Sequence, residues 1–287
     1  MNQRLRDGTL IVMDNGQDKF LQKLYGSKFG RFLLKPLVSP VVSKLGGWFM
    51  STRLSKCMIK GFIRKNNIDM SQFEEGPFRS YNAFFARRIK PGARTVDMDP
   101  THLISPCDCK LTALPIEQDS RFTIKHTPYT TAELLKDEAL AKVYQGGQIL
   151  IFRLTVDDYH RYCYFADGEK SGNTFIPGKL HTVNPIANDY YPIYKENSRE
   201  YTTLHTQAFG DVIVMEVGAL MVGKIVNHHG ACTVRRGEEK GYFQFGGSTV
   251  ILLLKAGAAQ LDQDILDNSR EGVETVVRMG EKIGQAC

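Results

Sequence analysis

The second half of the chain alternates short apolar runs with turns that contain glycine or proline. Runs of about four to eight apolar and β-branched residues between such turns are typical of β-strands. A helical pattern returns only near the end, over Asp262–Lys282. The predicted strands are Gln148–Thr155, Asn173–Ile176, Leu180–Val183, Asp211–Val217, Met221–Val226, Ala231–Val234 and Val250–Leu254.

The first part of the chain has a different pattern, in which apolar residues are interspersed with basic ones. Four apolar residues fall near one face of a helix predicted over Ser51–Lys65, and Ser51 or Thr52 can cap this helix. Pro36 and Pro40 divide the preceding stretch into short helices, because proline disrupts a helix interior. The two patterns together predict an α+β protein, with a helical N-terminal region on a β-rich body.

The boundary between these two parts falls in the connection Ala93–Leu103. We therefore divide the chain into residues 1–95 and 96–287. Hydrophobic residues make up 42% and charged residues 24% of the sequence, so global disorder is excluded. No internal repeat or low-complexity segment interrupts either part.

Charge is distributed unevenly along the chain. The formal net charge is +6, yet the stretch Lys19–Lys65 contains 11 lysines or arginines and no acidic residue. Apolar faces flanked by cations suit adsorption to an anionic membrane surface, where each basic group contributes about 1 kcal/mol. An ordinary helical layer with a solvated basic face is the alternative. A nucleic-acid surface is a third interpretation, but no nucleic-acid-binding motif occurs.

Other features limit the class of protein. No uncharged apolar run reaches the roughly 18–20 residues that a membrane-spanning helix needs. The residues that follow Met1 are polar and charged and do not form a secretory signal. None of the six cysteines has C-x-x-C spacing, so we expect reduced thiols in a cytosolic compartment and no metal site.

The sharpest local feature is Gly246-Gly247-Ser248-Thr249, directly before the apolar run Val250–Leu254. Glycine adopts backbone conformations closed to other residues, which the Ser248 hydroxyl would need in order to reach the carbonyl carbon of Gly247. Strained backbone of this kind is usually found where it has a use. On its own, the segment is more commonly a Gly-Gly turn that leads into a buried strand.

Two further polar residues have positions compatible with chemistry. His160 follows the predicted strand Gln148–Thr155, where it could act as a general acid or base near neutral pH. Asp108 lies in Ser105–Cys109 and could orient a histidine or cap a turn. On its own, a residue such as His160 is more often a hydrogen-bonded structural histidine.

Six segments in a fixed order and spacing, from Tyr81 to Leu254, favour a chemical role for these residues over a structural one. Together they make the chain resemble the phosphatidylserine decarboxylase family. The segments are Tyr81–Arg88 with Lys90–Arg94, Ser105-Pro106 with Asp108, Asp158–Arg161, Gly178–Pro185, Val217–Ala219 with Val222-Gly223, and Lys240–Phe243 leading into Gly246–Thr249.

The resemblance implies that Ser248 is the precursor of the cofactor. Its hydroxyl would attack the carbonyl of Gly247 and convert the amide to an ester. Elimination and hydrolysis would then leave a covalent pyruvoyl group on a new N-terminus. The products would be a β chain, Met1–Gly247, and an α chain, Ser248–Cys287. A Schiff base between this group and the substrate amine serves as an electron sink, so that phosphatidylserine loses CO2 and becomes phosphatidylethanolamine.

The same resemblance implies Ser248, His160 and Asp108 as catalytic residues, with His160 protonating the substrate Cα. The family usually has a second histidine three residues after the position of His160, where this chain has Cys163. The base for self-cleavage is therefore His160, His181 or a Cys163 thiolate. We favour His160, because its segment matches the family best.

The resemblance also implies partners and a location. The substrate is phosphatidylserine in a membrane, the β and α chains stay associated, and the family suggests a homodimer; nucleic acid is not expected. Residues 1–95 become a membrane-associating region at the cytoplasmic side of the cell membrane, and residues 96–287 the catalytic domain. Arg87, Arg88 and Lys90 are candidates for holding the lipid phosphate.

Two alternatives stay open. A pyruvoyl-dependent decarboxylase of a soluble amino acid would share the chemistry, but the basic, apolar N-terminal region argues against it. A lipid-binding relative that never matures would explain Cys163 in place of the usual histidine.

Overall fold

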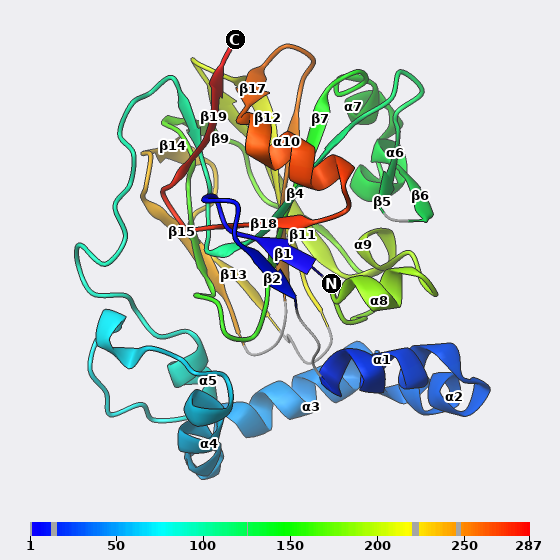
Figure 1. Cartoon of the computed structure of the whole chain (residues 1–287), viewed down its shortest axis with the longest axis vertical. Helices are drawn as coiled ribbons and strands as arrows, with labels where there is room; N and C mark the ends of the chain where they lie inside the picture. Colours follow the sequence, from blue (N-terminus) through cyan, green and yellow to red (C-terminus); the bar gives the residue numbers. More distant parts are fainter. Residues whose placement is uncertain (1, 13–15, 125, 220–223, 245–247) are drawn as a thin grey trace.

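The computed structural model describes residues 2–12, 16–124, 126–219, 224–244 and 248–287. Its centre is a sheet of 11 strands (Figure 1). Neighbouring strands in it are antiparallel, except that β1 and β18 are parallel. In spatial order the strands are β14 (Cys232–Val234), β9 (Gly168–Lys170), β11 (Arg199–Thr206), β12 (Gly210–Val217), β16 (Ser248–Leu254), β7 (Gln148–Leu154), β4 (Cys109–Pro115), β18 (Glu274–Val277), β1 (Asn2–Arg4) and β2 (Leu10–Val12), with β10 (Thr174–Ile176) paired to β11.

Smaller sheets complete the body. One contains β13 (Ile225–Asn227), β15 (Glu239–Phe243) and β8 (Arg161–Cys163). A second contains β17 (Ala259–Leu261), β19 (Lys282–Ala286) and β3 (His102–Ile104). The strands β5 (Arg121–Ile124) and β6 (Thr127–Thr130) form a separate pair.

The helices fall into two groups. The first group lies along one end of the body (Figure 1) and falls in sequence between β2 and β3. It contains α1 (Gly16–Gly26), α2 (Lys28–Leu37), α3 (Pro40–Ser51), the 3-10 helix η1 (Arg53–Lys56), α4 (Cys57–Lys65), the 3-10 helix η2 (Met70–Gln72) and α5 (Tyr81–Phe85). The second group packs on the sheet and contains α6 (Thr131–Leu135), α7 (Glu138–Lys142), α8 (Pro185–Asn188), α9 (Ile193–Glu196) and α10 (Gln263–Arg270).

Strand β16 is buried on both faces, between β12 and β7. Val250, Leu252 and Leu254 join an apolar cluster with α10 and the two smaller three-stranded sheets, on what we call the Val250 face. Ile251 and Leu253 join a second cluster with α1, α2 and α6–α9, on what we call the Ile251 face. Side chains alternate between the faces of a strand, so a strand covered on both faces reads as a continuous apolar run.

The mixed helix and strand content with a large β-sheet body agrees with the α+β prediction. The predictions for β7, β12 and β16 are correct to within two residues. The prediction of a strand over Leu180–Val183 is wrong, because the side chain of Asn197 bonds the amide and carbonyl groups of His181 in place of a neighbouring strand. Part of Met221–Val226 lies outside the described residues, and β13 begins at Ile225.

The helix predicted over Asp262–Lys282 is correct only in its first part, which forms α10, and is too long at its C-terminal end. α10 ends at Arg270, and Gly272 follows with a φ of 70°, a left-handed conformation that ends the helix. The next residues, Glu274–Val277, include β-branched side chains and enter the main sheet as β18. Residues Lys282–Ala286 then form β19.

The N-terminal part is more divided than predicted. Ser51 ends α3, and Thr52 is extended with φ −78° and ψ 159°, so Ser51–Lys65 is not one helix. Pro36 lies within the last turn of α2, while Pro40 lies in the first turn of α3, where proline is tolerated. The strands β1 and β2 had no signal in the sequence, and they join the main sheet through β18. No helix in the described ranges is both long and apolar enough to cross a bilayer.

Candidate active site

Ser248 is the first residue of β16 and pairs with Leu154, the last residue of β7. Leu154 packs in the cluster on the Val250 face, and residues directly opposite each other in an antiparallel pair point to the same face. The Ser248 side chain is fully buried, and its Oγ has no hydrogen-bond partner among the described residues. A buried hydroxyl without a partner is destabilising, and the hydroxyls of Ser43 and Thr249 share this feature, so it makes Ser248 a candidate without assigning its role. Gly246 and Gly247 lie outside the described residues.

The turn after β7 is fixed by a buried ion pair. The carboxylate of Asp158 accepts hydrogen bonds from the Thr155 amide at 2.7 Å and from the Lys110 ammonium at 2.7 Å. Lys110 belongs to β4, the strand next to β7, so the turn is tied to the sheet from which it emerges. His160 follows this turn by two residues and therefore has a defined position.

Backbone contacts connect the surroundings of His160 with those of Ser248. The amide of Phe243, the last residue of β15, donates to the His160 carbonyl at 2.9 Å. Five residues later, Ser248 pairs with Leu154. The segment from Phe243 to Ser248 contains the expected cleavage position. Its first residue bonds to His160, and its last residue pairs with Leu154, just before the turn that leads to His160.

The surroundings of His160 define which ring nitrogen carries the proton. Its Nδ1 lies 3.0 Å from the Asp158 carbonyl oxygen, which can only accept, so Nδ1 carries the hydrogen. Its Nε2 is buried and has no partner in the part of the chain that the structure describes. Burial lowers the pKa of His160 to about 3, and the charge of Arg87 acts in the same direction. At neutral pH the ring is therefore neutral, with the lone pair of Nε2 free to accept a proton.

Phe85 packs against the His160 ring, with the two ring centroids 4.0 Å apart. Phe85 is the last residue of α5, and the Arg161 guanidinium donates to the Ala86 carbonyl at 2.7 Å. These contacts hold α5 against the start of β8, so the imidazole is enclosed by residues far away in sequence. No sequence spacing predicted this packing.

Asp108 does not contact His160 through any hydrogen bond in the described residues. Its carboxylate accepts from the Arg94 guanidinium at 2.6–3.2 Å and from the amide of Met279 at 2.9 Å. The group that orients His160 is instead the carbonyl of Asp158. A catalytic role for Asp108 therefore stays a prediction, and its observed contacts join the Arg94 loop to the C-terminal segment.

Cys163, at the position of the usual second histidine, is buried in β8, and its amide donates to the Pro106 carbonyl at 2.8 Å. Burial raises the pKa of the Cys163 thiol to about 12. The side chain is therefore protonated at neutral pH, which argues against a thiolate base.

His181 is oriented differently from His160. Its ring stacks on Tyr191 at a centroid distance of 4.7 Å, and its Nε2 lies 3.5 Å from the Glu196 carboxylate. Tyr191 packs on the cluster of the Ile251 face, whereas Ser248 points to the other face of β16. Burial also lowers the pKa of His181, and its Nδ1 likewise has no partner in the described residues, so the face of the sheet on which it lies is what distinguishes it from His160.

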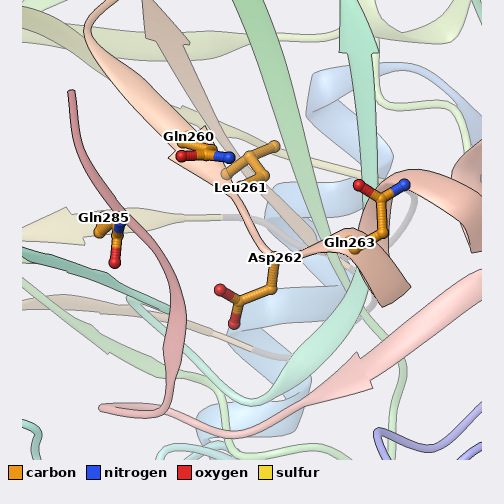
Figure 2. A pocket seen from close by; sticks show the side chains of 5 residues that line it. All are labelled: Gln260, Leu261, Asp262, Gln263 and Gln285. Carbon is orange, nitrogen blue, oxygen red and sulfur yellow. The ribbon is translucent and has the colours of Figure 1, made fainter.

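A surface hollow of about 220 Å³ lies elsewhere, where β17, β19 and the start of α10 meet (Figure 2). Neither Ser248 nor His160 lines it, and four of its five lining side chains are polar, so we assign it no part in the chemistry. In the described portion of the chain, no three histidine, cysteine, aspartate or glutamate residues form a group that could hold a metal ion.

Comparison with known proteins adds the decisive observation. The family model for phosphatidylserine decarboxylase matches residues 81–285, a range that contains Asp108, His160, Cys163 and Ser248. The chain belongs to the phosphatidylserine decarboxylase family. It is accordingly an enzyme of phospholipid metabolism, a carboxy-lyase whose relatives are named as proenzymes.

The similarity to individual family members extends beyond residues 81–285 and covers most of the chain. The chain is 48% identical over 272 residues to phosphatidylserine decarboxylase proenzyme 2 of Clostridium acetobutylicum, covering 94% of this chain and 92% of the relative. It is 41% identical over 272 residues to the proenzyme of Ruminiclostridium cellulolyticum (93% and 91%). It is 39% identical over 281 residues to that of Fusobacterium nucleatum subsp. nucleatum (95% and 92%).

Proposed function

We propose that this decarboxylase matures by self-cleavage between Gly247 and Ser248, and that it converts phosphatidylserine to phosphatidylethanolamine and CO2 through a pyruvoyl group derived from Ser248. One observation carries the proposal. Ser248 lies where β16 begins beside the end of β7, and the turn that follows β7 leads to His160; within the described residues neither the buried Ser248 hydroxyl nor Nε2 of the neutral His160 ring has a hydrogen-bond partner. The residues present therefore fit a site in which a serine becomes the cofactor.

The self-cleavage steps follow from these two residues. His160 Nε2 accepts the proton of the Ser248 hydroxyl, Oγ bonds to the carbonyl carbon of Gly247, and the C–N bond breaks as the amine takes up a proton. Loss of the Ser248 α-proton then expels Gly247 as a carboxylate and leaves a double bond between Cα and Cβ. Addition of water and loss of ammonia produce the ketone. General-base assistance of the first step typically contributes about 10²–10⁴ in rate.

For decarboxylation, the pyruvoyl group supplies an electron sink for the electron pair that remains at Cα when CO2 leaves. The chain must then deliver a proton to that carbon. We propose that His160, neutral at rest, first takes up a proton at Nε2, and its lowered pKa then makes the protonated ring a strong acid toward Cα. Phe85 and the burial of His160 keep bulk water from competing as the proton source.

The fold supports association of the two chains after cleavage. Strand β16 of the α chain keeps its hydrogen-bonded neighbours β12 and β7 on both sides, and β18 lies between β4 and β1. Arg153 in β7 pairs with Glu274 in β18, with Nε 2.7 Å from the carboxylate, and both side chains are buried. Breaking such a buried pair is costly because one charge is left uncompensated.

The helices at one end of the body support binding at a membrane surface. Most of the exposed large apolar side chains in the described residues lie on α1–α4 and η1, in the stretch that contains 11 basic residues and no acidic ones. We propose that this face adsorbs to an anionic membrane at the cytoplasmic side and so gives the active site access to its lipid. The side chains are Phe20, Phe29, Phe32, Leu33, Leu37, Val41, Leu45, Trp48, Phe49, Leu54 and Met58.

The membrane proposal predicts a selective effect of Trp48→Ala. Trp48 is 70% exposed, so its loss leaves the core intact but removes apolar area that would enter the bilayer. Burial of a large apolar side chain is worth about 1.5–3 kcal/mol, so we expect at least about tenfold weaker binding to phosphatidylserine-containing vesicles in a sedimentation assay. Phe175→Ala, which removes a 59% exposed ring from β10 of the body, is the control and should bind normally. Equal binding by the Trp48→Ala variant and wild type would contradict the proposed face.

The proposed reaction is tested by release of CO2. Carboxyl-labelled phosphatidylserine in vesicles should lose its label, whereas labelled free serine should not, because the enzyme would meet its substrate at a membrane. Equal turnover of free serine would favour the soluble amino acid decarboxylase. No release from either substrate, together with an uncleaved chain, would favour the non-maturing relative.

A further inference from the structure

Arg87 is a buried cation with unused hydrogen-bonding capacity. Its side chain is 2% exposed, and its guanidinium lies over the rings of Phe73 and Phe84, at 4.1 and 4.9 Å from the ring centroids. Within the described residues its guanidinium donates a single hydrogen bond, from Nη1 to the Phe84 carbonyl at 3.5 Å, the long limit of such contacts. Neither Nε nor Nη2 has a partner within the described ranges. Burial lowers the pKa of Arg87 to about 10, so it remains a cation at neutral pH.

Other buried arginines in the same fold are well satisfied. Arg199 donates to four backbone carbonyls at 2.7–3.0 Å. Arg153 pairs with the carboxylate of Glu274, and Arg236 donates to three carbonyls at 2.6–2.9 Å. A buried cation without such partners is destabilising by several kcal/mol, so Arg87 is an exception that a bound anion would explain.

Arg87 lies between the basic apolar helices and the catalytic histidine. It follows α5 by two residues, and α5 contacts α3, η1 and α4. Phe85, at the end of α5, packs on His160, and Arg161 donates to the carbonyls of Ala86 and Arg87. A lipid headgroup that passes from the proposed membrane face to His160 would therefore pass this guanidinium.

We propose that Arg87 binds the phosphodiester of the lipid headgroup and so positions the reacting carbon. This inference rests on the proposed function. The phosphorus atom of phosphatidylserine is three bonds from the reacting Cα, so the two groups lie close together. Arginine presents parallel N–H donors that match two phosphate oxygens. Of the three candidate cations, Arg88 is exposed and Lys90 is half-buried, so Arg87 alone is enclosed.

The substrate carboxylate is a poorer partner for Arg87 than the phosphodiester. The carboxylate loses its charge as CO2 forms, so an ion pair to it would stabilise the bound substrate more than the transition state. The phosphodiester keeps its charge throughout the reaction. An ion pair to the phosphodiester therefore improves binding without opposing the chemical step.

The test is Arg87→Gln in the processed enzyme with dihexanoyl-phosphatidylserine as substrate. We expect KM to rise about 10- to 100-fold with kcat within about threefold of wild type, the pattern for loss of an interaction made equally in ground and transition states. Dihexanoyl-phosphatidylethanolamine keeps the phosphodiester and lacks the carboxylate. Its competitive inhibition constant, and its dissociation constant from calorimetry, should rise by the same factor.

Several results would overturn the proposal. A higher KM with unchanged phosphatidylethanolamine binding would assign Arg87 to the carboxylate, and unchanged values for both lipids would leave it a structural cation. Arg79→Gln, which removes an exposed cation just before α5, is the control and should change neither constant. Loss of decarboxylation by wild type itself would count against the proposed function and not against Arg87, because calorimetry reports binding separately.

A second variant protects the test against misfolding. Arg87→Lys keeps the charge but loses the two-pronged donor geometry, so we expect a smaller rise in KM with normal processing and thermal stability. If Arg87→Gln fails to fold, Arg87→Lys decides the question. Wild-type values of KM and of phosphatidylethanolamine affinity in that variant would refute a bidentate contact.

Discussion

Replacing Ser248 by alanine will leave the chain as a single species of 32.3 kDa, whereas the wild type will yield fragments 1–247 and 248–287. The expected loss of cleavage is complete, because alanine has no atom that can form the ester. Intact-mass measurement of the purified protein decides between the two outcomes. The variant should still fold, since the Ser248 Oγ has no hydrogen-bond partner among the described residues.

Ser248→Cys is the matched control for this experiment. A thiol retains a nucleophilic atom at the same position, so we expect slow but detectable cleavage. If Ser248→Ala cleaves at the wild-type rate, or if the wild type remains a single uncleaved species, self-cleavage at this serine is refuted. A cooperative thermal unfolding transition of the Ser248→Ala variant would show that the comparison is not affected by misfolding.

The second large effect is expected at His160. His160→Ala should slow processing by at least about 10²-fold, because it removes the general base that we propose for the first step. His181→Ala and Cys163→Ala should leave both processing and decarboxylation measurable. The His181 ring lies on the Ile251 face of the sheet, and Cys163 is a protonated thiol. Normal processing by His160→Ala would show that the assignment is wrong.

The pH profile of wild-type processing gives an independent check on His160. The base form of a histidine predominates above its pKa, and burial lowers that of His160 from 6.5 to about 3. The cleavage rate should therefore stay nearly constant from about pH 8 down to about pH 5 and fall only as the pH approaches 3. A fall centred near pH 6.5 would mean that the cleaving state has a solvated histidine.

Local features of this chain could be predicted from its sequence, while long-range contacts could not. The strand β16 follows from a continuous apolar run, and the position of His160 follows from the end of β7. The contacts of Asp108 with Arg94 and Met279 join residues 14 and 171 positions apart, and no spacing rule indicates them. The turn position of Asp108 left both histidine orientation and turn capping open, and the resemblance favoured the first.

The ends of the chain illustrate the same limit. Three-residue strands such as β1 carry too little periodicity to be recognised, and β1 becomes a strand because β18 offers it a partner. The helix predicted over Asp262–Lys282 ends instead at Arg270, because Gly272 adopts a left-handed φ that the apolar pattern does not indicate. Likewise, Arg87 could not be separated from Arg88 and Lys90, because burial depends on the packing of Phe73 and Phe84.

The central position of β16 has a consequence for the lifetime of the mature enzyme. As one chain, the protein folds in a single unimolecular process, with β16 inserted between β12 and β7. Once residues 248–287 are a separate chain, recovery after unfolding becomes a bimolecular reaction that depends on concentration. Cleavage would thus make folding effectively a one-time event, so the mature enzyme would persist through a high barrier to unfolding, and damaged copies would have to be replaced by new synthesis.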